Sequence, residues 1–461
     1  MSSSTESDRP WYSGITGYQW LVLLIASLGW IFDVFEGQVF VVSMAEAMPA
    51  LPPLLFLTQD TEFCNNLAFA FFLLGGAAGG LFFGMLSDRV GRVRTMMVTI
   101  LFYSAFTCLS AFAQAREHII VLRFLVALGV GGEWAVASAM LAEVFPKHAR
   151  SMSLGIFHAS SIFGVWGAIA VGAWVVANPF FGPADFRLRW AFGVGIVPAL
   201  LTLWIYTSLH EPEAWLLARQ TAAQDRSRQT GRLLDLFQRD LLRPTLVGLT
   251  LATVGLATFW GVYVRGQSLL RELAEDARLG SAAAVLTPAQ RSEALRALPD
   301  EDKRSIKHTE MLAFLLISCG GGLGLLAFAP ISSRLGRRGA FLFYCLGGAA
   351  IALLVFQALP GGMPTLLWWI LPVFGFLTTG MHAGYAVYFP ELFPTRLRGT
   401  GGGFCFNGGR LLAAPILVLN GVLRSWNVSL ADSGAILSSL FLLGAVVLLV
   451  APETRGRELP T

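Results

Sequence analysis

The sequence is poor in charge and in cysteine for its length. Only 13% of its 461 residues are charged, whereas 55% are hydrophobic, and the mean hydropathy is +0.63. Soluble domains carry about 25% charged residues, so this composition excludes a soluble protein. The five cysteines show no disulfide or zinc spacing, which excludes a fold stabilised by either. Those that lie in or beside apolar runs are expected to be small buried hydrophobic groups: Cys108, Cys319, Cys345 and Cys405.

Other absences narrow the function. Residues Met1–Asp8 are Ser-rich and acidic and lack the basic start of a signal peptide, so we expect the first apolar run to be kept as a helix. No His-rich metal motif, nucleophile elbow or phosphate-binding loop occurs, so the sequence predicts neither an enzyme nor a bound cofactor or metal. The net charge of +4 comes from basic residues in short loops, which argues against a nucleic-acid partner.

Long apolar runs dominate what remains, and most of them are long enough to cross a hydrocarbon core of ~30 Å as helices. The runs cover residues 18–43, 66–86, 95–114, 118–143, 151–177, 190–209, 245–265, 309–329, 340–359, 365–389, 401–422 and 433–451. The sequence therefore predicts an all-α integral membrane protein with twelve transmembrane helices. Lys and Arg gather in the tails and short loops on the side that holds both termini, which predicts cytoplasmic termini in an inner or plasma membrane.

An internal repeat divides the twelve predicted helices into two halves. Glu143 and Arg150, in the pattern E-x-x-P-x-x-x-R after the fourth run, recur as Glu391 and Arg398 after the tenth run, 248 residues later. Such repeats are typical of transporters built from two related bundles.

A Pro-Glu pair ends each half, at 212–213 and again at 452–453. A segment rich in Arg, Glu and Ala follows the seventh run, and we expect it to continue that helix out of the membrane. The predicted parts are an N-terminal six-helix bundle at 1–215, a basic cytoplasmic linker at 216–243, and a C-terminal six-helix bundle at 244–461 with an external helical insertion at 266–308.

One charged turn, between the second and third runs, is unlike a generic loop. It combines Asp88 with the basic residues Arg89 and Arg92, and Gly84 and Gly91 allow close backbone approach. This turn resembles the G-x-L-x-D-R-x-G-R-(K/R) signature of the major facilitator superfamily. The resemblance implies a transporter with two pseudo-symmetric bundles of six helices around a central site.

The second copy of this turn departs from the signature, because Ser333 replaces the acid and Ala329 replaces the leading glycine. Other segments extend the resemblance over nearly the whole chain. Residues Arg123–Trp134 are similar to the fourth helix of superfamily transporters for sugars, sialic acid, lactate and other organic acids. Residues 210–215 and 452–456 are similar to the segments that follow the sixth and twelfth helices of sugar porters.

Few ionisable side chains lie inside the predicted spans. Each costs roughly 2.5–3.5 kcal/mol at the bilayer centre, so it normally faces a cavity and has a partner. For every one of them the alternative is a structural polar group that packs two helices together. The set is Asp33, Glu36, Arg123, Glu133, His158, His382 and Arg410.

Helix depth predicts that Asp33 and Arg123 meet. At about 1.5 Å per residue, both lie in the outer half of the bilayer core. The arrangement resembles the sugar/proton symporters of the superfamily, which place an aspartate of helix one against an arginine of helix four. The resemblance implies that Asp33 carries the proton and that Arg123 adjusts its proton affinity, with Glu36 and Glu133 as further candidates for proton coupling.

Arg410 is expected at a depth of about 15 Å, near the middle of the bilayer. A carboxylate substrate could meet it in a two-point contact, which predicts an organic-acid transporter. Alternatively Glu133 neutralises it, in a porter for sugars or other neutral solutes. The other predicted substrate-binding residues are Asn407, His158, Tyr263 and His382.

Charged residues at the cytoplasmic helix ends are predicted to latch the two halves together rather than to bind substrate. Asp88 can accept hydrogen bonds from a helix N-terminus of the opposite half. The predicted gating set is Gly84, Asp88, Arg89, Gly91, Arg92, Glu143, Arg150, Glu391 and Arg398.

These features together predict a secondary active transporter that moves a small organic acid with protons by alternating access. A sugar or another neutral metabolite is the alternative substrate, and a non-transporting membrane sensor is the alternative function. The predicted partners are a small-molecule substrate, protons and the lipid bilayer, and we expect a monomer.

Overall fold

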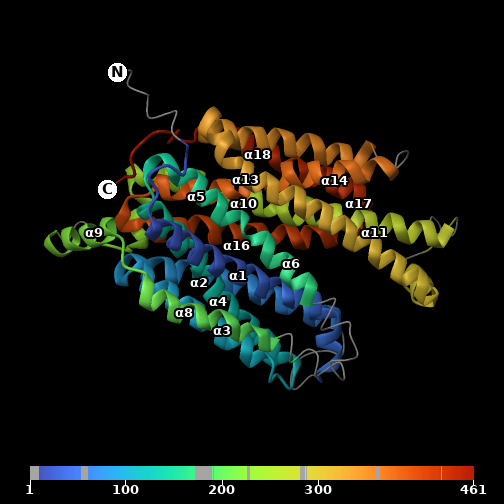
Figure 1. Ribbon diagram of the computed structural model, residues 1–461. Coiled ribbons are helices and arrows are strands. Elements are labelled where there is room, and N and C mark those ends of the chain that lie inside the picture. Colours follow the sequence, from blue (N-terminus) through green and yellow to red (C-terminus); the bar gives the residue numbers. More distant parts are fainter. Residues whose placement is uncertain are drawn as a thin grey trace.

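The computed structural model consists of helices packed in two bundles, one from the N-terminal half of the chain, blue to green in Figure 1, and one from the C-terminal half, yellow-green to red. Both ends of the chain lie at one end of the molecule, which we call the terminal side; the opposite end is the distal side. The residues described are 10–52, 61–171, 189, 192–225, 229–280, 286, 288–358, 364–426 and 428–460.

The N-terminal bundle supplies the first six spans. The fifth span consists of two helices, α5 and α6, that meet at Ser160. The helices are α1 (Gly17–Ala50), α2 (Thr61–Val90), α3 (Arg92–Ser110), α4 (Arg116–Val144), α5 (Lys147–Ala159), α6 (Ser161–Val171) and α8 (Val197–Ser208), with a 3-10 turn at Val194–Ile196 before α8. The linker that follows contains α9 (Glu213–Gln224) and a short turn of helix at Leu233–Phe237.

The C-terminal bundle repeats this arrangement with more irregular helices. Its seventh and ninth spans contain π-helical turns, at Phe259–Tyr263 and Leu354–Ala358. The helices are α10 (Arg239–Thr258), α11 (Val264–Leu279), α12 (Pro288–Ala297), α13 (Asp300–Leu353), α14 (Pro364–Thr379), α15 (Met381–Leu392), α16 (Arg398–Ser425), α17 (Leu430–Ser438) and α18 (Leu440–Val447), with a 3-10 turn at Thr395–Leu397 before α16.

The spans agree with the apolar runs of the sequence. In the described part of the chain, eight helices are long and apolar enough to cross a membrane. One of them, Glu301–Gln357, crosses twice because the backbone turns at Gly336, where φ is 79°. The shorter or more polar α8, α16 and α17–α18 account for the remaining three runs. The predicted all-α membrane fold of twelve helices in two bundles is confirmed.

Glycines let the same helix pair pack closely in each half. A Cβ atom at Gly75 of α2 would lie 2.2 Å from the carbonyl oxygen of Phe124 in α4. At Gly320 of α13, 245 residues later, it would lie 1.8 Å from the carbonyl oxygen of Pro372 in α14. Neither helix pair could come this close with a larger residue at the contact, so these glycines maintain the repeat in three dimensions.

Helices form most of the described part of the segment after the seventh span. The end of α11, all of α12 and the start of α13 project beyond the distal ends of the other C-terminal helices (Figure 1). Arg291 of α12 ties the projection to α11 through Asp276, at 2.6 Å, and Glu275, at 3.2 Å. Its function as a cap over the mouth of the transporter stays a prediction.

Candidate functional site

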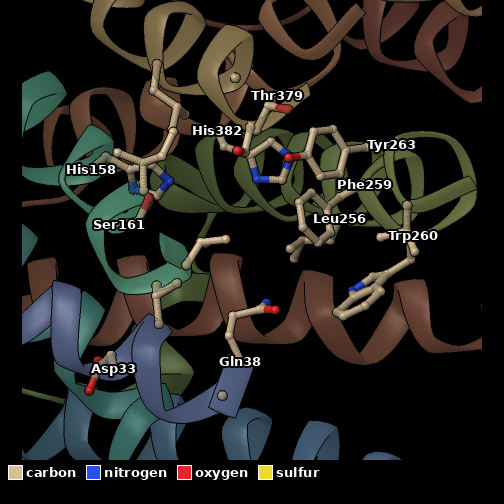
Figure 2. Close-up of a pocket in the computed structure, with 18 of the residues that line it drawn as sticks. Asp33, Gln38, His158, Ser161, Leu256, Phe259, Trp260, Tyr263, Thr379 and His382 are labelled. Carbon is tan, nitrogen blue, oxygen red and sulfur yellow. The ribbon is translucent and has the colours of Figure 1, made fainter. Parts of the chain in front are cut away.

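A cavity of about 310 Å³ lies between the two bundles, which is a suitable size for a small molecule. Figure 2 shows polar groups of both halves around it. Its polar lining residues are Asp33, Gln38, His158, Ser161, Ser318, Thr379, His382 and Arg410. Aromatic lining residues are Trp30, Phe69, Phe72, Phe259, Trp260, Tyr263, Phe314 and Phe406. The sequence analysis did not single out Gln38, Ser161, Ser318 or Thr379, because hydroxyl and amide groups are common in membrane helices.

A π-helical turn supplies part of the aromatic wall. It adds a residue to the turn between α10 and α11, and such insertions are frequent at functional sites. Phe259 stacks on Tyr263 with ring centroids 5.0 Å apart. Trp260 meets Phe69 of the opposite bundle edge to face, also at 5.0 Å. Tyr263, predicted to bind substrate, therefore does line the cavity.

Asp33 of α1 and Arg410 of α16 face the cavity from opposite bundles. Neither carboxylate oxygen of Asp33 has a hydrogen-bond partner among the described residues, and the same holds for Nη1 of Arg410. The two side chains attract each other electrostatically without forming an ion pair. The Arg410 guanidinium also lies 5.5 Å from the centre of the Phe406 ring. The cavity thus holds one acid and one cation that are open to other partners.

Arg123 forms its ion pair with Glu36, so the predicted contact between Asp33 and Arg123 was wrong. Arg123 Nη2 lies 2.8 Å from Glu36 Oε1 and Nη1 lies 3.1 Å from Oε2, and Thr107 donates to the same carboxylate at 2.8 Å. Phe40 covers the guanidinium, at 4.8 Å. Glu36 lies about one helical turn beyond Asp33, level with Arg123, and a depth estimate from the sequence does not resolve one turn. Neither Glu36 nor Arg123 lines the cavity.

Glu133 faces α1 and α3 instead of the cavity. Its Oε2 accepts a hydrogen bond of 2.6 Å from Thr99, and a Cβ at Gly29 of α1 would lie 2.8 Å from its Oε1. Within the described residues, Glu133 forms no ion pair with Arg410, and its Oε1 atom has no hydrogen-bond partner. The alternative in which Glu133 neutralises Arg410 is therefore not the arrangement of this structure.

Two histidines from opposite bundles line the cavity, and a backbone or side-chain partner holds each ring. Trp134 Nε1 donates to His158 Nδ1 at 3.1 Å, and Trp30 Nε1 donates to the His158 carbonyl at 3.2 Å. His382 Nε2 lies 3.2 Å from the carbonyl oxygen of Gly255. No local pattern singles out Trp30 or Trp134, because indole rings are frequent in membrane helices and their hydrogen-bond partners depend on helix rotation.

Asn407 differs from the other predicted substrate-binding residues, because it does not line the cavity. Its amide donates to the carbonyl of Gly131 at 3.1 Å and to that of Gly403 at 3.3 Å. The first contact joins α16 to α4 across the two bundles. Asn407 therefore serves helix packing in this structure.

The predicted gating residues of the first half meet on the terminal side and cross to the second half. Asp88 accepts from the amides of Gly399, at 3.1 Å, and Thr400, at 2.7 Å, and from the Thr400 hydroxyl at 2.6 Å. Gly84 also touches α16, because a Cβ there would lie 2.6 Å from the carbonyl oxygen of Gly399. Arg92 forms an ion pair with Asp88 and donates to the carbonyl of Thr395 at 3.0 Å.

Glu143 adds an ion-pair link between the bundles. It pairs with Arg92 at 2.9 Å and with Arg398 of the second half at 2.8 Å. Arg89 instead donates to the carbonyl of Gly231 in the linker, at 3.0 Å. Asp88, Arg92, Glu143 and Arg398 thus form one network that joins the two bundles on this side.

The symmetry-related counterparts of these residues make contacts within their own bundle. Arg337 pairs with Glu391 at 2.7 Å, as Arg92 pairs with Glu143. Arg150, the counterpart of Arg398, donates to backbone carbonyls of its own bundle, with its Nε 2.9 Å from that of Ala142. No ion pair joins Arg150 to Glu391 in the described residues.

In each half a glutamate accepts hydrogen bonds from the backbone of the charged turn. The pairing of Glu213 with Glu453 from the repeated Pro-Glu pair was wrong by two residues. Glu211 accepts from the backbone amides of Arg92 and Arg94, at 2.6 and 3.2 Å, after Gly91, whose φ is 130°. Glu453 does the same for Arg337, at 3.0 Å, so its counterpart is Glu211 rather than Glu213. Burial alone would raise the pKa of Glu453, but the backbone donors outweigh it and lower the pKa.

Comparison with known proteins agrees with this architecture. Residues 37–415 match the family described as Major Facilitator Superfamily. The chain belongs to this superfamily. It is therefore a multi-pass membrane transporter of small molecules and not an enzyme, as predicted. Its fold is that of a secondary transporter, and the predicted relation to metabolite:proton symporters is confirmed.

Individual relatives of this superfamily member match most of its length. It is 29% identical to the "Probable 4-methylmuconolactone transporter" of Cupriavidus pinatubonensis, over 97% of this chain and 93% of the relative. It is 28% identical to the "Cis,cis-muconate transport protein" of Acinetobacter baylyi, over 77% of each. The solved structure of the proton:xylose symporter XylE bound to 6-bromo-6-deoxy-D-glucose superposes with a TM-score of 0.73 at 18% identity, covering 96% of this chain and 98% of that one. At this identity the last comparison speaks for the fold alone.

Proposed function

We propose that this transporter is a proton-coupled symporter for a small organic carboxylate. The observation that supports the proposal most is the Arg410 guanidinium, which faces the cavity between the bundles with Nη1 unpartnered in the described residues. A buried cation of this kind is costly unless an anion meets it, and a carboxylate fits the planar guanidinium in two hydrogen bonds. Relatives named for muconate and 4-methylmuconolactone transport are consistent with such a substrate.

Asp33 is the proposed proton carrier. It shares the cavity with Arg410 and lies within its electrostatic reach, whereas the Glu36–Arg123 pair is enclosed beside it. Binding of a carboxylate at Arg410 weakens the attraction that favours ionised Asp33, so substrate and proton binding are coupled through one cation. Glu36 and Arg123 then serve to hold α1 against α4, and Glu133 is a reserve candidate for proton binding.

Alternating access follows from rocking of residues 1–215 against 244–461 around this cavity, with 216–243 as the linker. We place the terminal side in the cytoplasm, in an inner or plasma membrane, because basic loops gather there. The hydrogen bonds of Asp88 and the Glu143–Arg398 pair close that side, and Figure 1 shows the helix bundles diverging toward the distal side. The conformation fits an outward-facing monomer.

Uptake of labelled acids and sugars into proteoliposomes, with and without a pH gradient, tests the proposal. We expect acids to accumulate when the outside is acidic. Arg410→Gln should reduce uptake by about 100-fold, and Arg410→Lys by about tenfold, because an ammonium does not reproduce the two-point contact. Accumulation of sugars alone, or recovery of uptake in the Arg410→Gln/Glu133→Gln double variant, would favour the neutral-solute porter.

Proton coupling has its own test. Asp33→Asn should abolish accumulation driven by the pH gradient but leave exchange of preloaded substrate, since exchange does not require release of the proton. Glu133→Gln tests the second candidate acid in the same assay, because it removes a buried acid that does not line the cavity. Normal accumulation by Asp33→Asn would transfer the coupling role to another acid.

A further inference from the structure

The hydrogen bond from Trp134 determines where the proton of His158 lies. An indole nitrogen only donates, so the bond from Trp134 Nε1 requires a lone pair on His158 Nδ1. The ring is then neutral and carries its proton on Nε2. No described residue bonds to Nε2, and the ring lines the cavity. His158 therefore offers a hydrogen-bond donor to whatever occupies the cavity.

His382 offers the cavity a hydrogen-bond acceptor, whereas His158 offers a donor. The carbonyl oxygen of Gly255 only accepts, so the bond of 3.2 Å requires a proton on His382 Nε2. The remaining nitrogen, Nδ1, forms no bond with a described residue. Phe259 and Tyr385 flank the ring, at 5.6 and 5.4 Å, and no carboxylate among the described residues pairs with it. In these surroundings the ring is neutral, and Nδ1 is an acceptor.

We infer that His158 and His382 together bind a hydroxyl group of the substrate, so that this transporter takes hydroxycarboxylates. The hydroxyl oxygen accepts from His158 Nε2, and its hydrogen is donated to His382 Nδ1. A hydroxyl is the simple group that satisfies a donor and an acceptor at once. The assignment rests on the proposed function, since it presumes that Arg410 holds the carboxylate.

The placement of the two rings supports this inference. They come from opposite bundles, α5 and α15, and both line the cavity. Figure 2 shows both rings at the same wall, with Ser161 beside His158 and Thr379 beside His382. A hydroxyl held between them would bridge the two halves, as a carboxylate at Arg410 would bridge α16 to Asp33 of α1.

Trp134 is a positioning residue in this scheme. It is buried, with 1% of its surface exposed, and does not line the cavity. Its ring stacks on Phe406 at 4.1 Å, and Phe406 in turn carries the Arg410 guanidinium on its face. The histidine donor and the arginine cation are thus held by one stack of side chains, which keeps the distance between the two proposed subsites constant.

Matched pairs of acids test the hydroxyl subsite on the purified full-length protein in nanodiscs. The probes are lactate and propionate, mandelate and phenylacetate, and 3-(4-hydroxyphenyl)propionate and 3-phenylpropionate. We expect the hydroxylated member of at least one pair to bind about tenfold more tightly, because its partner leaves a donor and an acceptor unpaired. Equal affinities within every pair would overturn the inference.

Trp134→Phe is the diagnostic variant, because it keeps an aromatic ring on Phe406 and removes only the indole donor. The preference for the hydroxylated acid should fall below about threefold, with the affinity for the deoxy acid unchanged. Tyr344→Phe is the matched control: it removes a buried ring donor, to the Gly324 carbonyl, from a residue that does not line the cavity, so the preference should persist. A preference that survives Trp134→Phe would remove Trp134 and the tautomer from the scheme.

A spectroscopic measurement separates a folding defect from loss of the tautomer. ¹⁵N spectra of histidine-labelled protein should show unprotonated Nδ1 signals for His158 and His382, of which the His158 signal changes in Trp134→Phe and neither changes in Tyr344→Phe. Binding of acids that depends on Arg410 but not on the hydroxyl would overturn this inference alone. Absence of acid binding, with binding of neutral sugars, would overturn the proposed function as well.

Discussion

The two copies of the charged turn on the terminal side share their internal contacts but differ in what they reach. In both, a glutamate accepts from the amides that follow a glycine with positive φ, and an arginine pairs with a second glutamate. The first copy also carries Asp88, which bonds to Gly399 and Thr400 of the other bundle. The second copy has Ser333, whose hydroxyl donates to Pro330 in its own helix. Only the first copy therefore forms a strong link between the halves.

The helix that each turn faces explains the difference. The helix α16 begins at Arg398, so the amides of Gly399 and Thr400 lie in its first turn and have no partner within the helix. The counterpart of Gly399 is Ser151, but α5 begins four residues before it, at Lys147. The amide of Ser151 is thus beyond the first turn and is bonded within α5. An acid in the second copy would find no free donor there.

The buried charged contacts that close the terminal side come mainly from the first half. The acids Asp88 and Glu143 belong to the first bundle, and their cross-bundle partners are backbone amides and Arg398 of the second. In the reverse direction the described contacts are weaker: a Ser151–Ser332 pair of hydroxyls, at 3.4 Å, and an exposed ion pair between Glu458 and Lys147, at 3.0 Å. The replacement of the acid by Ser333 in the second copy therefore destabilises the closed state little.

The largest effect is expected from Asp88→Asn. The variant removes the charge that accepts three hydrogen bonds from α16 and pairs with Arg92, and such charged bonds contribute about 1.5–3 kcal/mol each. Transport should fall by about 10–100-fold as the terminal side opens. Distances between spin labels placed in the two bundles at that side would measure the opening. Unchanged distances would contradict the gating role.

The next largest effect is expected from a matched pair of variants, one in each half. Glu143→Gln should slow transport by about tenfold, because it leaves Arg92 and Arg398 buried with less compensation and removes the link between the halves. Glu391→Gln removes a pairing within the second half and should lower thermal stability without opening the terminal side. Equal opening in the two variants would show that closure is symmetric after all.

A smaller effect is expected in the pH dependence of thermal stability, through Glu453 of the second turn. Because the folded state lowers the pKa of Glu453, this residue stabilises the fold above its ordinary pKa of 4.5, and the contribution is lost as the pH falls through the lowered value. Melting temperatures measured between pH 6 and 3 should therefore fall less steeply for Glu453→Gln than for the natural protein. Glu213→Gln, at an exposed position, is the control.

The smallest effect is expected from Ser333→Asp, which restores the acid of the signature. Since the amide of Ser151 is already bonded within α5, the new carboxylate gains no backbone donor in the opposite half. Transport and the spin-label distances should change less than about twofold. A marked stabilisation of the closed state would mean that α5 shifts to expose its first turn. It would contradict the view that the second copy of the turn has no free donor to bind.

Much of this protein followed from local features of the sequence. Apolar runs predicted the twelve spans because hydropathy and length decide membrane insertion residue by residue. The charged turn predicted the superfamily, and the rarity of charge in the spans singled out Asp33 and Arg410, which do face the cavity. These inferences need no knowledge of how one helix is rotated against another.

The tertiary structure decided which groups meet. Asp33 and Glu36 are three residues apart on α1, and only the rotation and depth of α1 against α4 assign Arg123 to Glu36. The same holds for Glu211 as the counterpart of Glu453, and for the indole of Trp134 that holds His158. A shift of one helical turn, about 5.4 Å, exceeds the reach of a hydrogen bond, so partners within the membrane depend on packing that no local pattern encodes.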